Sequence, residues 1–291
     1  MTSKQAVLLD EIFQAGEPRE VVSAGFVERR DMQGLRPGMK INDNVIDGWI
    51  QVFNEHLKRR HLHGAHRPRS GVLNSKFYEA LAMFGQYEYE RVRRWTLKFG
   101  DVFEMDKLFV PLCLNNRWIF VMLDFQTRNI SYYNAYDQGY DAVVVDGRLI
   151  TRETVLCNLR RWVCDECMCK KGVGMSSTSW TIQPNPTDLP KLDKSDTTND
   201  ATFVLKSIQQ LANGKPISVT DALLPHLRAK IAIELYTGCI TDEGLQRRAR
   251  LFAFYFAMKL LVLAKRAREK AWHPNSEHVA TLAETWTKRV A

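Results

Sequence analysis

Residues 106–136 read DKLFVPLCLNNRWIFVMLDFQTRNISYYNAY, and this stretch decides the fold. It contains three short apolar runs that are separated by two turn signals. The runs are Leu108–Cys113, Trp118–Phe125 and Ile130–Tyr133, and the turns are Asn115-Asn116 and Gln126–Asn129. Turn residues between runs of β-branched and aromatic residues are typical of antiparallel strands that follow one another in sequence. The stretch therefore predicts a β-meander.

Helical patterns flank this meander on both sides. Upstream, Asn42 or Asp43 is a plausible N-cap for a helix with apolar residues at helical spacing, and a short helix is expected over Ser75–Met83 behind a serine cap. Downstream, the predicted elements are a helix that Thr151 caps and that ends near Met168, a strand at Ser179–Ile182, and helices at Phe203–Leu211 and Leu223–Leu235.

Composition places the chain among ordinary globular proteins. The 291 residues are 45% hydrophobic and 25% charged, which argues against disorder as the dominant state. The net charge of +8 favours acidic partners, such as nucleic acid, anionic lipid or an acidic protein face.

The N-terminal residues carry charges too early for a secretory signal, and no apolar stretch reaches the roughly 20 residues of a membrane span. We therefore expect an intracellular protein of the nucleus or cytoplasm, with no membrane span and with its six cysteines reduced.

The meander also resembles the central sheet of the SUMO-specific (ubiquitin-like) cysteine proteases. That family's pattern is Val-Pro, a turn, His-Trp, a strand, Asp, a basic turn and Tyr-Tyr-Asp-Ser. The matching residues here are Val110-Pro111, Arg117-Trp118, Asp124-Phe125, Arg128 and Tyr132-Tyr133-Asn134-Ala135. The resemblance continues upstream through Leu35–Asp43 and downstream from Trp180 to Leu235.

The resemblance implies an α+β, papain-like ubiquitin-like-protease fold, with a central mixed β-sheet flanked by helices. We expect this domain over residues 25–238, after an N-terminal appendage at 1–24 and before a C-terminal helical extension at 239–291. Within that extension, Leu251–Ala264 is apolar almost all round, which predicts self-association or docking onto a partner.

A cysteine protease needs a thiolate, a base and a group that orients the base. Carried over from the family, the base position is Arg117, the orienting position is Asn134 and the nucleophile position is Ala201. The family's oxyanion glutamine falls on Ser195, or on Lys191 or Leu192 if the loop is aligned on its proline. A trapping substitution would account for Ala201, but not for Arg117 and Asn134 as well.

The family also clamps a Gly-Gly tail between two tryptophans. Trp118 keeps one of these positions, Lys40 stands at the other, and Asp43 matches the family. The sequence therefore predicts a catalytically inactive homologue that acts as a protein-binding or scaffold module, with SUMO or another ubiquitin-like protein as its possible partner. An alternative is an active or mutated deSUMOylating or deubiquitinating peptidase with its nucleophile position at Ala201.

A further alternative is a basic protein that associates with nucleic acid. It rests on a dense basic stretch, whose residues are Lys58, Arg59, Arg60, Arg67 and Arg69. We expect no cofactor. The crowded thiols Cys164, Cys167 and Cys169 are a weak candidate for a metal site, because a zinc finger needs two separated pairs of ligands.

Overall fold

The computed structural model describes residues 3–14, 21–23, 27–62, 69–82, 86–136, 142–145, 148–183, 186, 189–193 and 196–240. The chain divides into two compact units, Met1–Ile240 and Thr241–Ala291. The second unit lies outside the described residues. The expectations for a C-terminal helical extension and for residues 251–264 therefore remain predictions.

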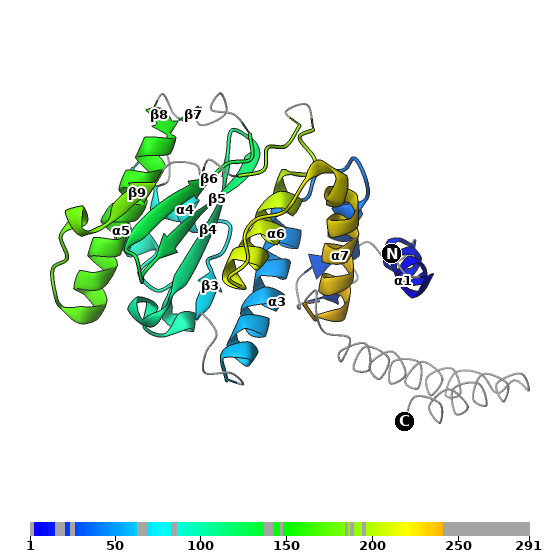
Figure 1. Ribbon diagram of the computed structural model, residues 1–291, viewed down its shortest axis with the longest axis horizontal. Helices are drawn as coiled ribbons and strands as arrows, with labels where there is room; N and C mark the ends of the chain where they lie inside the picture. Colours follow the sequence, from blue (N-terminus) through cyan, green and yellow to red (C-terminus); the bar gives the residue numbers. More distant parts are fainter. Residues whose placement is uncertain are drawn as a thin grey trace, which may run out of the picture. The chain divides into compact units, whose positions relative to one another are not determined.

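A five-stranded mixed sheet forms the centre of the first unit, in the order β3-β4-β5-β6-β9 (Figure 1). Its strands are β3 (Ser70–Val72), β4 (Lys107–Leu114), β5 (Arg117–Asp124), β6 (Asn129–Tyr133) and β9 (Thr181–Gln183). β4, β5 and β6 pair antiparallel in sequence order, whereas the two edge strands pair parallel to their neighbours. The predicted meander is confirmed, and the strand predicted at Ser179–Ile182 is observed as β9, which pairs with β6 at the edge of the sheet.

The turn residues explain why the meander folds back where it does. Asn115 and Asn116 have φ values of 47° and 59°, and Arg128 has a φ of 51°. Asparagine tolerates the left-handed region better than other residues with a side chain, so the Asn-Asn pair suits the two-residue turn between β4 and β5.

Alternating side chains give the sheet two apolar faces. One face, which includes Val110, Val121 and Tyr132, packs in a single core with α4 (Phe77–Leu81) and α5 (Arg152–Lys171). On the other face, Phe120 stacks on Tyr133 with ring centroids 4.5 Å apart. That face is covered by α6 (Asp200–Ala212), which places the start of α6 beside the sheet (Figure 1).

The remaining elements surround this core. They are α1 (Ser3–Phe13), β1 (Val21–Ser23), β2 (Val27–Glu28), α2 (Arg29–Met32), α3 (Asp43–Leu62), β7 (Ala142–Val145), β8 (Arg148–Thr151) and α7 (Leu224–Thr237). Short 3₁₀ turns are η1 (Gln33–Leu35), η3 (Tyr89–Arg91), η4 (Leu97–Phe99), η5 (Val102–Glu104), η7 (Ser177–Ser179) and η8 (Asp221–Leu223). α1, which belongs to the predicted appendage, packs against α7.

Helix starts follow the predicted caps in most places. The Asn42 side chain accepts the N–H of Val45 at 3.1 Å, and the Thr151 hydroxyl accepts the N–H of Thr154 at 3.2 Å. The serine cap was wrong for α4, which begins at Phe77. Ser75 is instead tied to α3, because its N–H donates to the Asp47 carboxylate at 2.8 Å.

The side chain of Asn54 completes the β3 edge of the sheet. Its amide nitrogen donates to the carbonyl of Val72 at 2.8 Å, and its amide oxygen accepts the N–H of Val72 at 2.9 Å. One side chain on α3 thereby satisfies both backbone groups of a buried residue, as a neighbouring strand would.

Replacing Asn54 by alanine should therefore lower the free energy of unfolding by about 1–3 kcal/mol, because two buried backbone groups lose their partners. Urea denaturation measures the change. Gln51→Ala removes an exposed amide from the same helix and should stay within about 0.5 kcal/mol of the native chain. Equal effects of the two substitutions would contradict the role of Asn54.

Candidate functional site

The start of β5 and the start of α6 meet at a single carboxylate. Asp200 accepts the N–H of Trp118 at 3.0 Å through one oxygen and the N–H of Ala201 at 2.8 Å through the other. Two segments that are about 80 residues apart in sequence are thereby fixed side by side. The family-derived base position, Arg117, directly precedes Trp118, and the family-derived nucleophile position, Ala201, itself donates one of these two bonds.

Arg117 is buried at the first position of β5, with 5% of its surface exposed. Its guanidinium lies 4.3 Å from the centre of the Tyr136 ring and donates to the carbonyl of Asp196 at 3.0 Å. The Tyr136 hydroxyl donates to the same carbonyl at 3.3 Å. Arg117 therefore packs as a cation between an aromatic ring and the loop that leads into α6.

Asn134 follows β6 and is also buried. Its side-chain oxygen accepts the N–H of Tyr136 at 2.9 Å, which shapes the turn that carries the Tyr136 ring to Arg117. Ala201 is the second residue of α6 and is 1% exposed. The structure thus brings all three family-derived positions to one end of the sheet, at the end of β6 and the starts of β5 and α6.

Asp200 is the main ionisable acid of this region. Burial raises the pKa of its carboxyl group, while the N–H groups of Trp118 and Ala201, together with Arg117 and Lys40, act in the opposite direction. Negative charge is therefore already costly at the start of α6. The N–H of Ala201 points to this carboxylate, so in this arrangement it is not offered to a substrate oxyanion.

The side chains of Arg117, Asn134 and Ala201 limit the chemistry that is possible at these three positions. A guanidinium carries only donors, an asparagine has no carboxylate charge, and an alanine methyl group cannot attack a carbonyl carbon. None of the three side chains can accept a proton from a nucleophile or act as one. Ser195, which the alignment offers for the oxyanion glutamine, lies outside the described residues.

The three predicted cleft residues differ in exposure. Trp118 is 9% exposed, Lys40 is exposed, and Asp43 is half-buried and forms an ion pair with Lys76 at 2.6 Å. Sequence reasoning missed Lys76, whose charge offsets that of Asp43. The spacing of the two residues in sequence gives no signal of the pair.

Cys113 is an exposed thiol directly across from Trp118 in the β4–β5 pairing. Partial burial by surrounding protein atoms raises the pKa of Cys113 to about 11, and the carboxylates of Asp200 and Asp43 act in the same direction. A nucleophilic cysteine needs a lowered pKa. The environment of Cys113 therefore does not suit it to replace the missing nucleophile.

Cys113 should react slowly with iodoacetamide at pH 8 in the native chain. A pKa of about 11 instead of 9.0 gives roughly 100-fold less thiolate. The greater nucleophilicity of that thiolate recovers part of the loss, so we expect roughly tenfold slower alkylation than in the urea-denatured chain. Peptide mass spectrometry over a time course measures the rates, and equal rates in the two states would contradict this environment.

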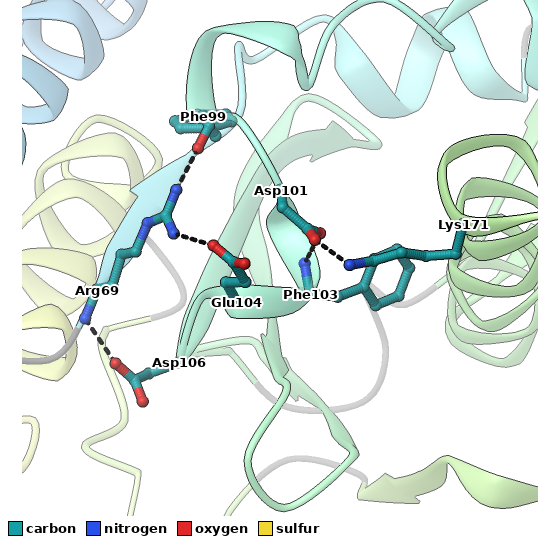
Figure 2. Close-up of polar contacts among 7 residues, drawn as sticks. All are labelled: Arg69, Phe99, Asp101, Phe103, Glu104, Asp106 and Lys171. Atoms are coloured by element: carbon teal, nitrogen blue, oxygen red, sulfur yellow. Dashed lines mark hydrogen bonds and ion pairs between the residues drawn. The ribbon is translucent and has the colours of Figure 1, made fainter.

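The described residues of the predicted basic stretch divide into exposed cations and cations that bind other parts of the protein. Lys58 and Arg59 are exposed near the end of α3, but Arg60 donates to the side chain of Asn213, and Arg67 lies outside the described residues. Figure 2 shows that Arg69 is bound internally: its guanidinium donates to the carbonyl of Phe99 at 2.7 Å and to Glu104 at 3.1 Å. Its backbone N–H donates to Asp106 at 2.6 Å.

The same polar cluster ties α5 to the segment before β4. Lys171, at the end of α5, pairs with Asp101, whose carboxylate also accepts the N–H of Phe103 at 2.9 Å (Figure 2). Arg69 and Lys171 therefore hold the fold together, which leaves fewer cations for phosphate contacts than the sequence suggested.

The thiols of Cys164, Cys167 and Cys169 do not come together as a metal site. Within the described part of the chain, no group of three or more His, Cys, Asp or Glu side chains is placed to hold a metal ion. The reason is geometric, because residues 164 and 169 are five apart on α5 and so project from different faces of the helix. Among the residues that the structure describes, no helix is long and apolar enough to cross a membrane.

Comparison with known proteins identifies the family. The sequence profile of the Ulp1 protease family, C-terminal catalytic domain, matches residues 39–242. The chain belongs to this family. The match covers the predicted cleft residues, the three family-derived positions and α7, so the resemblance seen in the meander extends through the Ulp1-type domain.

Relatives in the Ulp1 family share modest identity with the chain. Sentrin-specific protease 2 of Mus musculus is 25% identical over 226 residues, which span 76% of this chain and 34% of the relative. A sentrin-specific protease of Caenorhabditis elegans is 27% identical over 63% of this chain and 24% of its own length. The chain therefore spans about a third or less of the length of these relatives.

Solved structures of Ulp1-type domains confirm the fold. The C-terminal Ulp1 protease domain in complex with Smt3, the yeast ortholog of SUMO, aligns with a TM-score of 0.64 at 19% identity, over 83% of this chain and 97% of that one. The catalytic domain of the Ulp1-like SUMO protease of Chaetomium thermophilum gives 0.64 at 17% identity, over 85% and 94%. The predicted papain-like α+β fold is thus confirmed.

Proposed function

We propose that this chain is a catalytically inactive member of the Ulp1 protease family that binds a ubiquitin-like protein without cleaving it. The observation that carries the proposal is the junction made by Asp200. Asp200 holds the starts of β5 and α6 together, and at this junction Arg117 and Ala201 stand where the family pattern has its base and its nucleophile.

Two further features support inactivity. The N–H of Ala201 donates to Asp200, so the backbone donor at the helix start is already engaged. Arg117 is packed on Tyr136 and bonded to the carbonyl of Asp196, so the residue at the family-derived base position makes structural contacts instead.

The proposed partner is SUMO or a related ubiquitin-like protein, because a Ulp1 domain of the same fold forms a complex with Smt3. Lys40, Asp43 and Trp118 are proposed to contact its C-terminal tail. With one tryptophan of the family's clamp replaced by Lys40, and with Asp43 paired to Lys76, we expect weaker binding than in an active protease of the family.

Titration of the isotope-labelled chain with SUMO, and separately with ubiquitin, tests the binding. We expect chemical shift changes that report on residues near Lys40 and Trp118, and a roughly tenfold higher Kd for Lys40→Glu if the charge lies at the contact. Lys58→Glu, also exposed but near the end of α3, is the matched control and should leave Kd unchanged. Absence of shift changes with both proteins would remove the binding half of the proposal.

A further inference from the structure

Arg228 on α7 makes an unusual number of backbone contacts for one side chain. It is 2% exposed, and its guanidinium donates to five oxygens in two separate segments. The acceptors in the first segment are the carbonyls of Gly34 at 2.5 Å, Leu35 at 3.1 Å and Met39. Those in the second are the carbonyl of Thr198 at 2.7 Å and the side-chain oxygen of Asn199 at 3.0 Å.

The first segment is loop 34–40, which leads to the proposed cleft residue Lys40. Residues 36–40 are all exposed, so few side chains anchor them to the core. The loop is compact, since a Cβ atom on Gly34 would lie 2.7 Å from the carbonyl oxygen of Lys40. Because the contacts of Arg228 fall near both ends of this loop, they fix where Lys40 lies relative to the body of the domain.

The second segment is the last turn before α6. Asn199 is the N-cap of α6, and its carbonyl accepts the N–H of Phe203 at 3.0 Å. Asp200 and Ala201 follow at once, so the position of Asn199 sets where the Asp200 carboxylate meets Trp118. A guanidinium that holds Asn199 therefore also holds the start of α6, which carries the family-derived nucleophile position.

We propose that Arg228 is the positioning residue that keeps loop 34–40 and the start of α6 in register, so that the two segments act as one unit toward a bound protein tail. This inference rests on the proposed binding function for its consequence, but its structural content can be tested separately. Only the planar fork of arginine, with five donors, reaches both segments at once; lysine keeps the charge but not this geometry.

Hydrogen exchange in the full chain tests the coupling through Arg228→Lys. We expect amides of residues 34–44 and of residues 199–205 to exchange at least tenfold faster in the variant, while amides of β4 and β5 stay within twofold. Arg69→Lys is the matched control, because Arg69 also bonds a backbone carbonyl but lies in a different polar cluster. It should leave both segments unchanged.

Binding provides the second readout. If the native chain binds SUMO or ubiquitin, Arg228→Lys should raise Kd at least tenfold and Arg69→Lys should not. If the native chain binds neither, the proposed function fails while the exchange result still decides the coupling. Faster exchange in only one segment, in neither, or equally across the whole chain would overturn the role of Arg228.

Discussion

Replacing Ala201 by cysteine is expected to leave the hydrolysis of a fluorogenic SUMO or ubiquitin C-terminal substrate at background. The new thiol would sit at the start of α6, but the residue at the family-derived base position, Arg117, cannot remove its proton. Arg117 has no lone pair to accept one, and it is fixed between the Tyr136 ring and the carbonyl of Asp196. The restored nucleophile would therefore lack the partner that every cysteine protease of this type needs.

The combined variant Ala201→Cys, Arg117→His, Asn134→Asp is the informative comparison. It returns a thiol, a base and an orienting carboxylate to an end of the sheet that Asp200 already holds together. A positioned general base contributes about 10²–10⁴-fold, so we expect turnover at least about 100-fold above the single variant. Comparable turnover in the single and combined variants would contradict the role assigned to Arg117.

Replacing Glu234 by alanine should lower the free energy of unfolding by more than the Asn54→Ala substitution does. Glu234 is fully buried on α7, where it accepts from Lys206 of α6 at 2.5 Å and from the indole of Trp49 on α3 at 2.7 Å. Glu234→Ala would leave the ammonium of Lys206, itself 3% exposed, without its counter-charge. We expect the free energy of unfolding to fall by about 3–5 kcal/mol, because a charge buried among three helices loses its counter-charge.

The double variant Lys206→Met, Glu234→Leu tests whether the buried charge causes this loss. It removes both charges and keeps apolar volume, so it should recover much of the loss, as replacement of buried ion pairs by apolar residues often does. Urea denaturation followed by circular dichroism measures all three chains. A loss below about 1 kcal/mol in Glu234→Ala, or an equal loss in the double variant, would contradict a buried charge as the cause.

The sheet could be read from the sequence because its signals are local. The Asn115-Asn116 pair marks a turn, and the nearly continuous apolar runs of β4 and β5 mark strands whose two faces are both covered. Helix ends were less certain. α6 starts at Asp200, three residues before the predicted Phe203, because the polar Asp-Ala-Thr start carries no apolar periodicity.

The site was predicted only where the family pattern supplied positions. That pattern placed Arg117, Asn134 and Ala201 together, and the structure places them at one end of the sheet. It gave no hint of the contact between Arg117 and Tyr136, of Asp200 as the link between β5 and α6, or of Arg228. These contacts join residues 19 to 194 positions apart, and no local propensity records them.

The central claim, that the fold is kept without the reaction, is tested most directly by the native chain itself. The chain should be incubated in molar excess with a SUMO precursor, beside a sentrin-specific protease domain as positive control, and the precursor's C-terminus followed by mass spectrometry. We predict that the precursor stays intact with this chain while the control removes its C-terminal extension. Appearance of the processed C-terminus with the native chain would contradict the account.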